Sequence, residues 1–139
     1  MALPVVFSTT ASRQSVMGYH VVDPADLDPE PDRPSEMRYV SEAADLDHLG
    51  LRVYRVDPGE EIPLSGLHYH DEQEEVFHVL DGTLDVETPD ETFAVPAGHF
   101  FAAEPGSPHR AHNAADADEP VRVIGMGAPP QSDGHSVDR

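Results

Sequence analysis

Three histidines and a glutamate stand at spacings that could hold a metal ion. His68 and His70 are two residues apart, so on a β-strand both imidazoles project from the same face. An acidic residue, Glu74 or Glu75, follows after a short turn, and a third imidazole, His109, lies downstream. Three neutral imidazoles and one carboxylate suit a divalent transition metal (Fe, Mn, Ni, Zn, Co or Cu). Such a donor set leaves coordination positions open for water or substrate.

The choice of carboxylate depends on which way the following strand faces. If Glu75 points inward, Phe77 and Val79 point inward with it, and if Glu74 does, His78 joins the interior instead. Alternation alone leaves both alternatives open. A His-x-His pair by itself is also common in cross-strand packing, so the metal site depends on the residues that accompany the pair.

The segment that carries the pair resembles the first motif of the cupin superfamily. That motif is His-x-His, three or four residues, Glu, six residues and Gly, and here His68, His70, Glu75 and Gly82 fit it in full. The gap of six residues to the glycine fits Glu75 and not Glu74. The glycine expected before the first histidine is displaced, since Gly59 stands three residues earlier than the motif has it.

The segment from Gly98 to Asn113 resembles the second cupin motif. Gly98, Gly106, His109 and Asn113 all stand at the expected spacing, and Glu104 replaces the usual proline. Two motifs in the right order make the resemblance specific, and together they cover residues 50–127. It implies an all-β fold, a cupin double-stranded β-helix (jelly-roll barrel), with the metal held inside by His68, His70, Glu75 and His109.

The resemblance also implies a small-molecule substrate or ligand. Cupin dioxygenases make dioxygenase-like chemistry the first expectation, and isomerisation or decarboxylation is compatible with the same donor set. The alternative is a cupin that binds or senses metal and ligand without turnover, and a third reading is a structural barrel with a vestigial site. No catalytic residue stands out beyond the ligands, although Tyr54 or Glu104 could serve as a base.

The elements that must position these residues are short strands. From Leu51 onward, apolar or alternating runs recur with Gly, Pro and Asp between them, which is typical of an all-β sandwich or barrel. Asp81-Gly82 between two apolar runs predicts a hairpin, because Gly accepts a positive φ. The expected strands are 51–57, 67–70, 75–80, 83–87, 92–95, 100–103, 109–113 and 121–126.

The chain is expected to divide into an N-terminal arm with an acidic, Pro-rich loop (1–40), the cupin barrel (41–127) and a flexible tail (128–139). Residues 41–50 suggest at most one short helix, with Ser41 as its N-cap and Gly50 as its stop. Residues 1–16 contain no Asp or Glu, so either Met17 is the native start or the arm is a neutral edge strand.

The charge balance excludes several classes of function. The 139 residues include 27 Asp and Glu against 8 Arg, with no Lys and no Cys, which gives a net charge of −19. Such a chain repels phosphates, so neither nucleic acid nor an anionic membrane is expected as a partner. Catalysis by lysine or cysteine is impossible. Without a membrane-spanning apolar run or a signal peptide, the protein is expected to be cytoplasmic.

The acidic, lysine-free composition resembles that of proteins from halophiles that accumulate salt, and it indicates a haloarchaeal source. A homodimer is also expected, because the open edges of a jelly roll are usually paired or covered.

Other residues of the barrel have simpler expected roles. His78 and His112 are expected to face away from the metal, and His20, His48, His99 and His135 to lie on arms, rim and tail. An apolar wall is expected from Phe77, Val79 and Phe93 or Val95, with only one of Phe100 and Phe101 facing inward. Arg52, Arg55 and Arg110 could clamp a substrate carboxylate, but salt bridges to the abundant acids are favoured.

Overall fold

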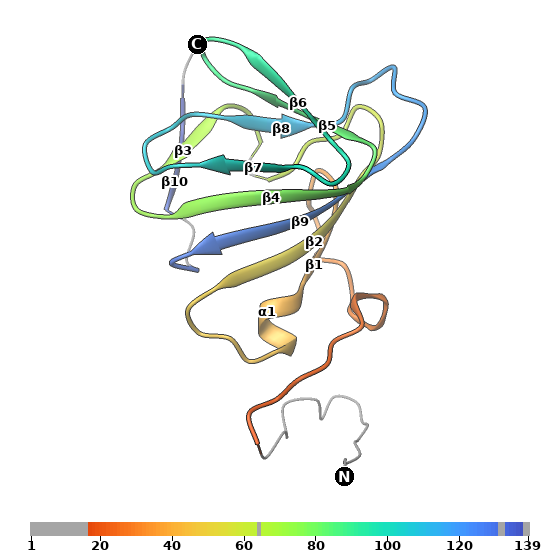
Figure 1. The fold of residues 1–139 in the computed structure, drawn as a ribbon, viewed down its shortest axis with the longest axis vertical. Helices are drawn as coiled ribbons and strands as arrows, with labels where there is room; N and C mark the ends of the chain where they lie inside the picture. The colour runs from red at the N-terminus through yellow and green to blue at the C-terminus, as the bar shows by residue number, and fades with distance from the viewer. Residues whose placement is uncertain (1–16, 64, 131–132, 138–139) are drawn as a thin grey trace.

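The computed structural model describes residues 17–63, 65–130 and 133–137, and these form antiparallel β-sheets joined by short turns (Figure 1). The all-β prediction is confirmed. The elements in chain order are η2 (Pro24–Asp26), β1 (Glu36–Tyr39), α1 (Val40–Ala43), β2 (Gly50–Val56), β3 (His68–His70), β4 (Glu74–Asp81), β5 (Thr83–Glu87), β6 (Thr92–Pro96), β7 (Phe100–Ala103), β8 (Arg110–His112), β9 (Val121–Ala128) and β10 (Gly134–Ser136).

One layer is a five-stranded sheet with the order β1-β2-β9-β4-β7. The other is built from a three-stranded sheet, β6-β5-β8, and from the pair β10-β3. An isolated bridge between His68 and His109 joins β3 to the start of β8, so the two smaller sheets continue each other. Strands that are distant in sequence, such as β4 and β9, therefore lie side by side (Figure 1).

The core lies between the layers and follows from strand alternation. Along β4 and β9, buried and half-buried residues alternate, so each strand turns one face inward. Phe77 and Val79 from β4 meet Val123 from β9, and Leu84 and Val86 enter from β5. Because all of these side chains are apolar and almost completely buried, they hold the layers together by the hydrophobic effect.

The β4–β5 hairpin turns where the Asp81-Gly82 dipeptide predicts it. Gly82 has φ +81°, which disfavours a side chain, and a Cβ there would lie 3.1 Å from the carbonyl oxygen of Pro120. Both the turn and the close approach therefore require glycine.

The helix expected over residues 41–50 is longer than the one present. The structure has one short helical turn, α1, whose N-cap is Tyr39 and not Ser41; Ser41 lies inside the turn and is buried. The turn ends early because Asp45 adopts φ +58°, outside the helical region.

Two more expectations differ from the structure. Residues 36–39, assigned to the arm, form β1 at the edge of the large sheet, because Met37 is buried there while Glu36 and Arg38 face outward. The tail from Pro129 is also not simply frayed, since β10 pairs with β3 over Gly134–Ser136. The predictions for residues 1–16 lie outside the described residues.

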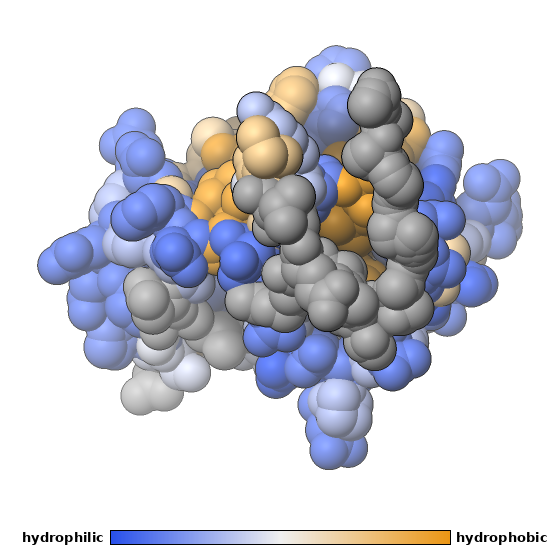
Figure 2. Space-filling view, turned by 90° about the horizontal axis from the view of Figure 1, so that it is seen from below, coloured by the Kyte–Doolittle hydropathy of each residue, from blue (hydrophilic) through white to orange (hydrophobic). Residues whose placement is uncertain are grey.

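The visible surface is mostly hydrophilic. In Figure 2, hydrophilic residues cover most of the visible face and enclose smaller apolar areas. Among the described residues, none of the helices is long and apolar enough to cross a membrane.

Phe77 tests the position of the core. Truncating it to alanine should lower the free energy of unfolding by about 3–5 kcal/mol, because a ring that is 1 % exposed would leave a cavity. The same truncation at Phe93, which is 40 % exposed, should cost clearly less. Urea unfolding of both variants measures the difference, and equal losses would contradict the assigned core.

Candidate metal centre

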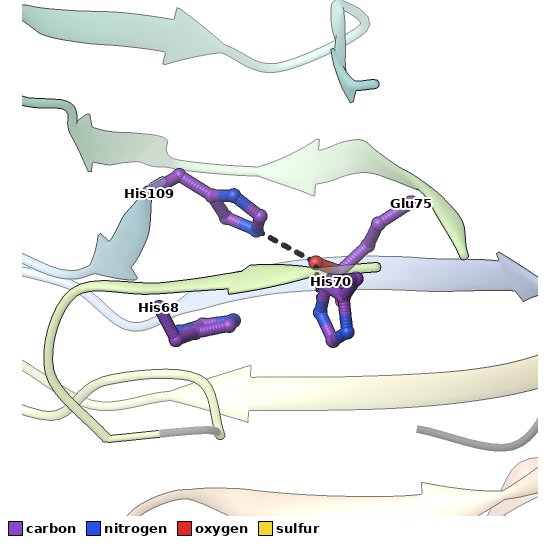
Figure 3. A group of neighbouring side chains, drawn as sticks. All are labelled: His68, His70, Glu75 and His109. Carbon is purple, nitrogen blue, oxygen red and sulfur yellow. Dashed lines mark hydrogen bonds and ion pairs between the residues drawn. The ribbon is translucent and has the colours of Figure 1, made fainter. Parts of the chain in front are cut away.

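Four side chains from three parts of the chain converge inside the barrel. His68 and His70 come from β3, Glu75 from β4 and His109 from the residue before β8, as Figure 3 shows. One ligand atom from each residue lies within 4.8 Å of all the others. All four residues are buried, with exposures of 2–5 %. The four residues that the sequence singles out are therefore positioned to bind one metal ion.

Backbone pairing accounts for this convergence. His68 and His109 exchange two main-chain hydrogen bonds, of 3.0 and 2.8 Å, which fix the start of β8 beside β3. The amide of Gly106 donates to the carbonyl oxygen of His70 at 2.7 Å, so the turn before His109 is tied to the same strand. Gly106 has φ +82°, a conformation that favours glycine. The second motif thus positions its histidine through its turn.

The ring orientations leave the correct nitrogens free for a metal. The Nδ1 of His68 donates to the carbonyl oxygen of Gly66 at 3.0 Å, and that of His109 to the carbonyl oxygen of Ser107 at 2.9 Å. Since a carbonyl oxygen only accepts, each ring carries its proton on Nδ1. The Nε2 of each ring then points toward the centre of the cluster, where a metal would take its lone pair.

Two of these nitrogens have no hydrogen-bond partner within the described chain, although that of His70 lies 3.4 Å from Glu75 Oε1. The Nε2 atoms of His68 and His70 are buried and make no hydrogen bond there, although buried polar atoms are normally satisfied. The Nε2 of His109 lies 2.7 Å from Glu75 Oε1 (Figure 3). A divalent cation would satisfy all three nitrogens and the carboxylate together, so the donor set fits a metal.

The charges of the cluster are set by burial and by contacts among its members. Burial alone would raise the pKa of Glu75, but its contacts with His109 and His70 outweigh burial and lower that pKa to about 2. Burial lowers the pKa of His68. The carboxylate of Glu75, 3.4 Å from Nε2 of His70, raises the pKa of that imidazole, against the effect of burial. Glu75 is therefore ionised at neutral pH and ready to act as a ligand.

The orientation of β4 distinguishes the two glutamates. Glu75 is buried beside the histidines together with inward-facing Phe77, whereas Glu74 is exposed. Half-buried His78 stacks on the exposed ring of Phe100, with ring centroids 4.1 Å apart. The strand phase that places Glu75 inward is thus the one present.

Apolar rings line one side of His109. The centroids of Phe77 and Phe101 lie 6.4 and 6.0 Å from the imidazole, and Phe93 packs on Phe101 at 5.9 Å. Of the adjacent pair, Phe101 packs against the core while Phe100 is 64 % exposed. These rings exclude water from that side of the centre.

The three arginines of the barrel that could bind a carboxylate have different partners. Arg55 pairs with Asp57 at 3.2 Å, and Arg110 pairs with Glu61 and Glu87 at 2.9 and 3.5 Å, so both form the salt bridges that were favoured. Arg52 is different, because its Nη2 lies 3.9 Å from Oε2 of Glu75, inside the barrel.

The side chain of Asn113, which is in phase with His109, hydrogen-bonds to the backbone of the barrel rather than to the metal centre. Its Nδ2 donates to the carbonyl oxygens of Val56 and Glu119, at 3.0 and 2.9 Å. The remaining histidines lie elsewhere: His112 contacts Arg110, His99 is exposed, and His135 pairs with Asp71 at 2.7 Å.

Sequence reasoning missed Asp133. Its Oδ1 lies 3.3 Å from Nδ1 of His70, and its Oδ2 accepts a hydrogen bond of 2.6 Å from the amide of Glu72. Asp133 thus faces the outer nitrogen of His70, as carbonyl oxygens do for the other two imidazoles. Only the pairing of β10 with β3 brings this tail residue to the site, and no sequence motif marks it.

Comparison with known proteins agrees with this centre. Residues 52–126, more than half of the chain, match the family model described as "Cupin domain". This chain belongs to the cupin family. The cupin double-stranded β-helix expected from its two motifs is thereby confirmed.

The proteins similar to this cupin are named for different activities. The polyketide synthase CurC of Streptomyces cyaneus is 32 % identical over 108 residues, which cover 75 % of this chain and 66 % of CurC, just under two thirds of its length. The polyketide cyclase RemF of Streptomyces resistomycificus superposes with a TM-score of 0.70, at 21 % identity, covering 86 % of this chain and 85 % of RemF. A sugar phosphate isomerase of Silicibacter pomeroyi gives 0.71 at 20 % identity, with 86 % and 82 % covered. At such identities the two structures show the fold alone.

Asp133 should strengthen metal binding. Replacing it with asparagine should weaken Co²⁺ affinity by about tenfold, because His70 loses the carboxylate that orients its ring and raises its basicity. Asp71→Asn is the matched control, since Asp71 contacts β10 through His135 and no histidine of the centre. Isothermal titration measures both variants. If the two lose affinity equally, the contribution belongs to the docking of β10 and not to Asp133.

Metal uptake should release a proton from His70. The raised pKa of this imidazole favours its protonated form, whereas the lowered pKa of His68 favours the neutral ring. Because a metal binds only the neutral ring, Co²⁺ affinity should fall as the pH is lowered, by at most about tenfold per pH unit for each proton displaced. Titrations in buffers of different ionisation enthalpy count the protons, and a pH-independent affinity would contradict this assignment.

Proposed function

We propose that this cupin is an enzyme that binds one divalent transition metal through His68, His70, Glu75 and His109 and acts on a small organic molecule. The single observation that carries the proposal is the buried cluster. Its four potential ligand atoms lie within 4.8 Å of one another, and two imidazole nitrogens lack hydrogen-bond partners among the described residues. A structural barrel with a vestigial site would have no reason to keep such a costly arrangement.

The chain's own groups suit this task. Glu75 is ionised, so it contributes a negative charge without first losing a proton. Phe77 and Phe101 form a dry wall beside His109. A divalent ion held there would supply Lewis-acid polarisation of a substrate oxygen or a site for O₂. Burial raises the pKa of Tyr54, so its hydroxyl keeps its proton at neutral pH and suits a donor better than a base.

One relative supports a class of substrate. CurC is named a polyketide synthase, and its 32 % identity supports a carbonyl-rich, enolisable substrate for this chain. Dioxygenase-like oxidation, isomerisation and decarboxylation are alternatives for the same donor set, and so is ligand binding without turnover. The homodimer expected from the sequence stays a prediction, with the exposed Phe100 on edge strand β7 as one surface that it could cover.

Metal content tests the proposal directly. Protein purified without chelator should contain stoichiometric metal, and Glu75→Gln should lose most of it, because a neutral amide is a poor ligand in place of a carboxylate. Glu74→Gln is the matched control on the same strand and should keep its metal, since Glu74 is exposed. Elemental analysis of the three proteins decides this. Absence of metal from the wild type, even after loading with Fe²⁺, Mn²⁺ and Zn²⁺, would refute the proposal.

Turnover separates an enzyme from a binding protein. Metal-loaded protein is incubated with a panel of enolisable ketones, oxo acids and sugars while substrate loss and O₂ uptake are followed. Loss of a substrate that depends on Glu75 supports the enzyme. Tight binding of a compound without its loss would favour the non-catalytic alternative.

A further inference from the structure

The polar groups around Glu75 leave hydrogen-bonding capacity unused. Among the described residues, the buried Nε and Nη2 atoms of Arg52 and the hydroxyl of Tyr54 have no hydrogen-bond partner. Arg52 and Tyr54 are alternate residues of β2, and the Arg52 guanidinium lies 6.0 Å from the centroid of the Tyr54 ring. The unsatisfied donors thus lie together on one strand.

Strand register places Arg52 opposite the metal centre. β9 lies between β2 and β4, and Gly125 and Gly127 are its buried residues at this level. Arg52 pairs with Gly125, and Glu75 pairs with Gly127. Arg52 and Glu75 therefore project from the same face of the sheet, and their charged groups approach across β9 to 3.9 Å.

The donors of Arg52 are not consumed by Glu75. The distance of 3.9 Å is an ion pair but too long for a hydrogen bond, and the side chain of Arg52 is only 13 % exposed. A buried guanidinium is normally fully hydrogen-bonded, because burial without partners is costly. Arg55 and Arg110, by contrast, have close carboxylate partners.

The positive charges of the metal-loaded centre and of Arg52 also call for a ligand between them. With a divalent ion on Glu75 and three neutral imidazoles, the centre carries a net positive charge, and the guanidinium of Arg52 adds another. Positive charges this close together in a buried site repel each other strongly. An anionic ligand with two oxygens, one for the ion and one for Arg52, would compensate both.

We infer that Arg52 is the second anchoring point for the ligand of this centre, which is a small molecule with a delocalised oxyanion, such as a carboxylate or an enolate. The planar guanidinium suits such a group, because it presents parallel N–H donors. The Tyr54 hydroxyl supplies a further donor on the same strand. This inference rests on the proposed function and specifies the chemistry of its substrate.

The test uses the full chain loaded with Co²⁺, whose visible spectrum reports on its ligands. Acetate and acetylacetone, which binds as its enolate after releasing a proton to the buffer, should shift the spectrum saturably, whereas acetamide, a neutral analogue of acetate, should not. Arg52→Gln should keep stoichiometric cobalt but weaken binding of both anions by at least about tenfold. Arg55→Gln is the matched control on β2 and should bind them like the wild type, since Arg55 is exposed and pairs with Asp57.

The outcomes separate this inference from the proposed function. Failure of the wild type to take up cobalt would refute the metal centre itself. Uptake of cobalt with unchanged anion binding in Arg52→Gln would overturn the role of Arg52 alone. Loss of cobalt from a folded Arg52→Gln would also overturn it, because Arg52 would then serve to hold Glu75.

A second variant covers the case in which Arg52→Gln does not fold. Arg52→Lys keeps the charge but cannot present two parallel N–H groups. It should retain cobalt and bind acetate more weakly than the wild type, and unchanged acetate affinity in this variant would overturn the inference.

Discussion

The two main-chain hydrogen bonds between His68 and His109 are the constraint on which the centre depends. They join β3 to the start of β8, and so bring together histidines that are 41 residues apart in the chain. Once this register is fixed, the carbonyl oxygens of Gly66 and Ser107 set the two ring orientations. Glu75 then completes the cluster from β4, on the opposite layer. The ligand geometry is therefore a consequence of backbone pairing.

Charge is distributed differently inside and outside this barrel. Among the described residues, the acidic side chains other than Glu75 are exposed or half-buried, where water and salt screen them. Inside, Glu75 and Arg52 face each other near three imidazoles. Burial strengthens the electrostatic interactions of every charge there. The acidic composition thus governs the interaction of the surface with solvent, while the few buried charged groups determine which ligands the centre can hold.

Much of the barrel could be predicted from local pattern. Runs such as Thr83–Glu87 and Phe100–Ala103 became strands with the expected bounds, because alternation and turn residues are properties of neighbouring residues. β1 was missed because Pro and acidic residues around it conceal its two inward side chains, Met37 and Tyr39. The strand β10 was missed because its stability comes from pairing with β3 and not from its own composition.

The sequence by itself determined which residues form the metal centre, because the two-residue spacing of His68 and His70 on a strand and the turn before His109 are encoded locally. It also identified Glu75, through the distance to Gly82. Only the tertiary structure decided what surrounds them. Asp133 reaches His70 through β10, and Arg52 reaches Glu75 across strand β9. Such contacts join residues that no local pattern links, because they depend on which strands pair and in which register.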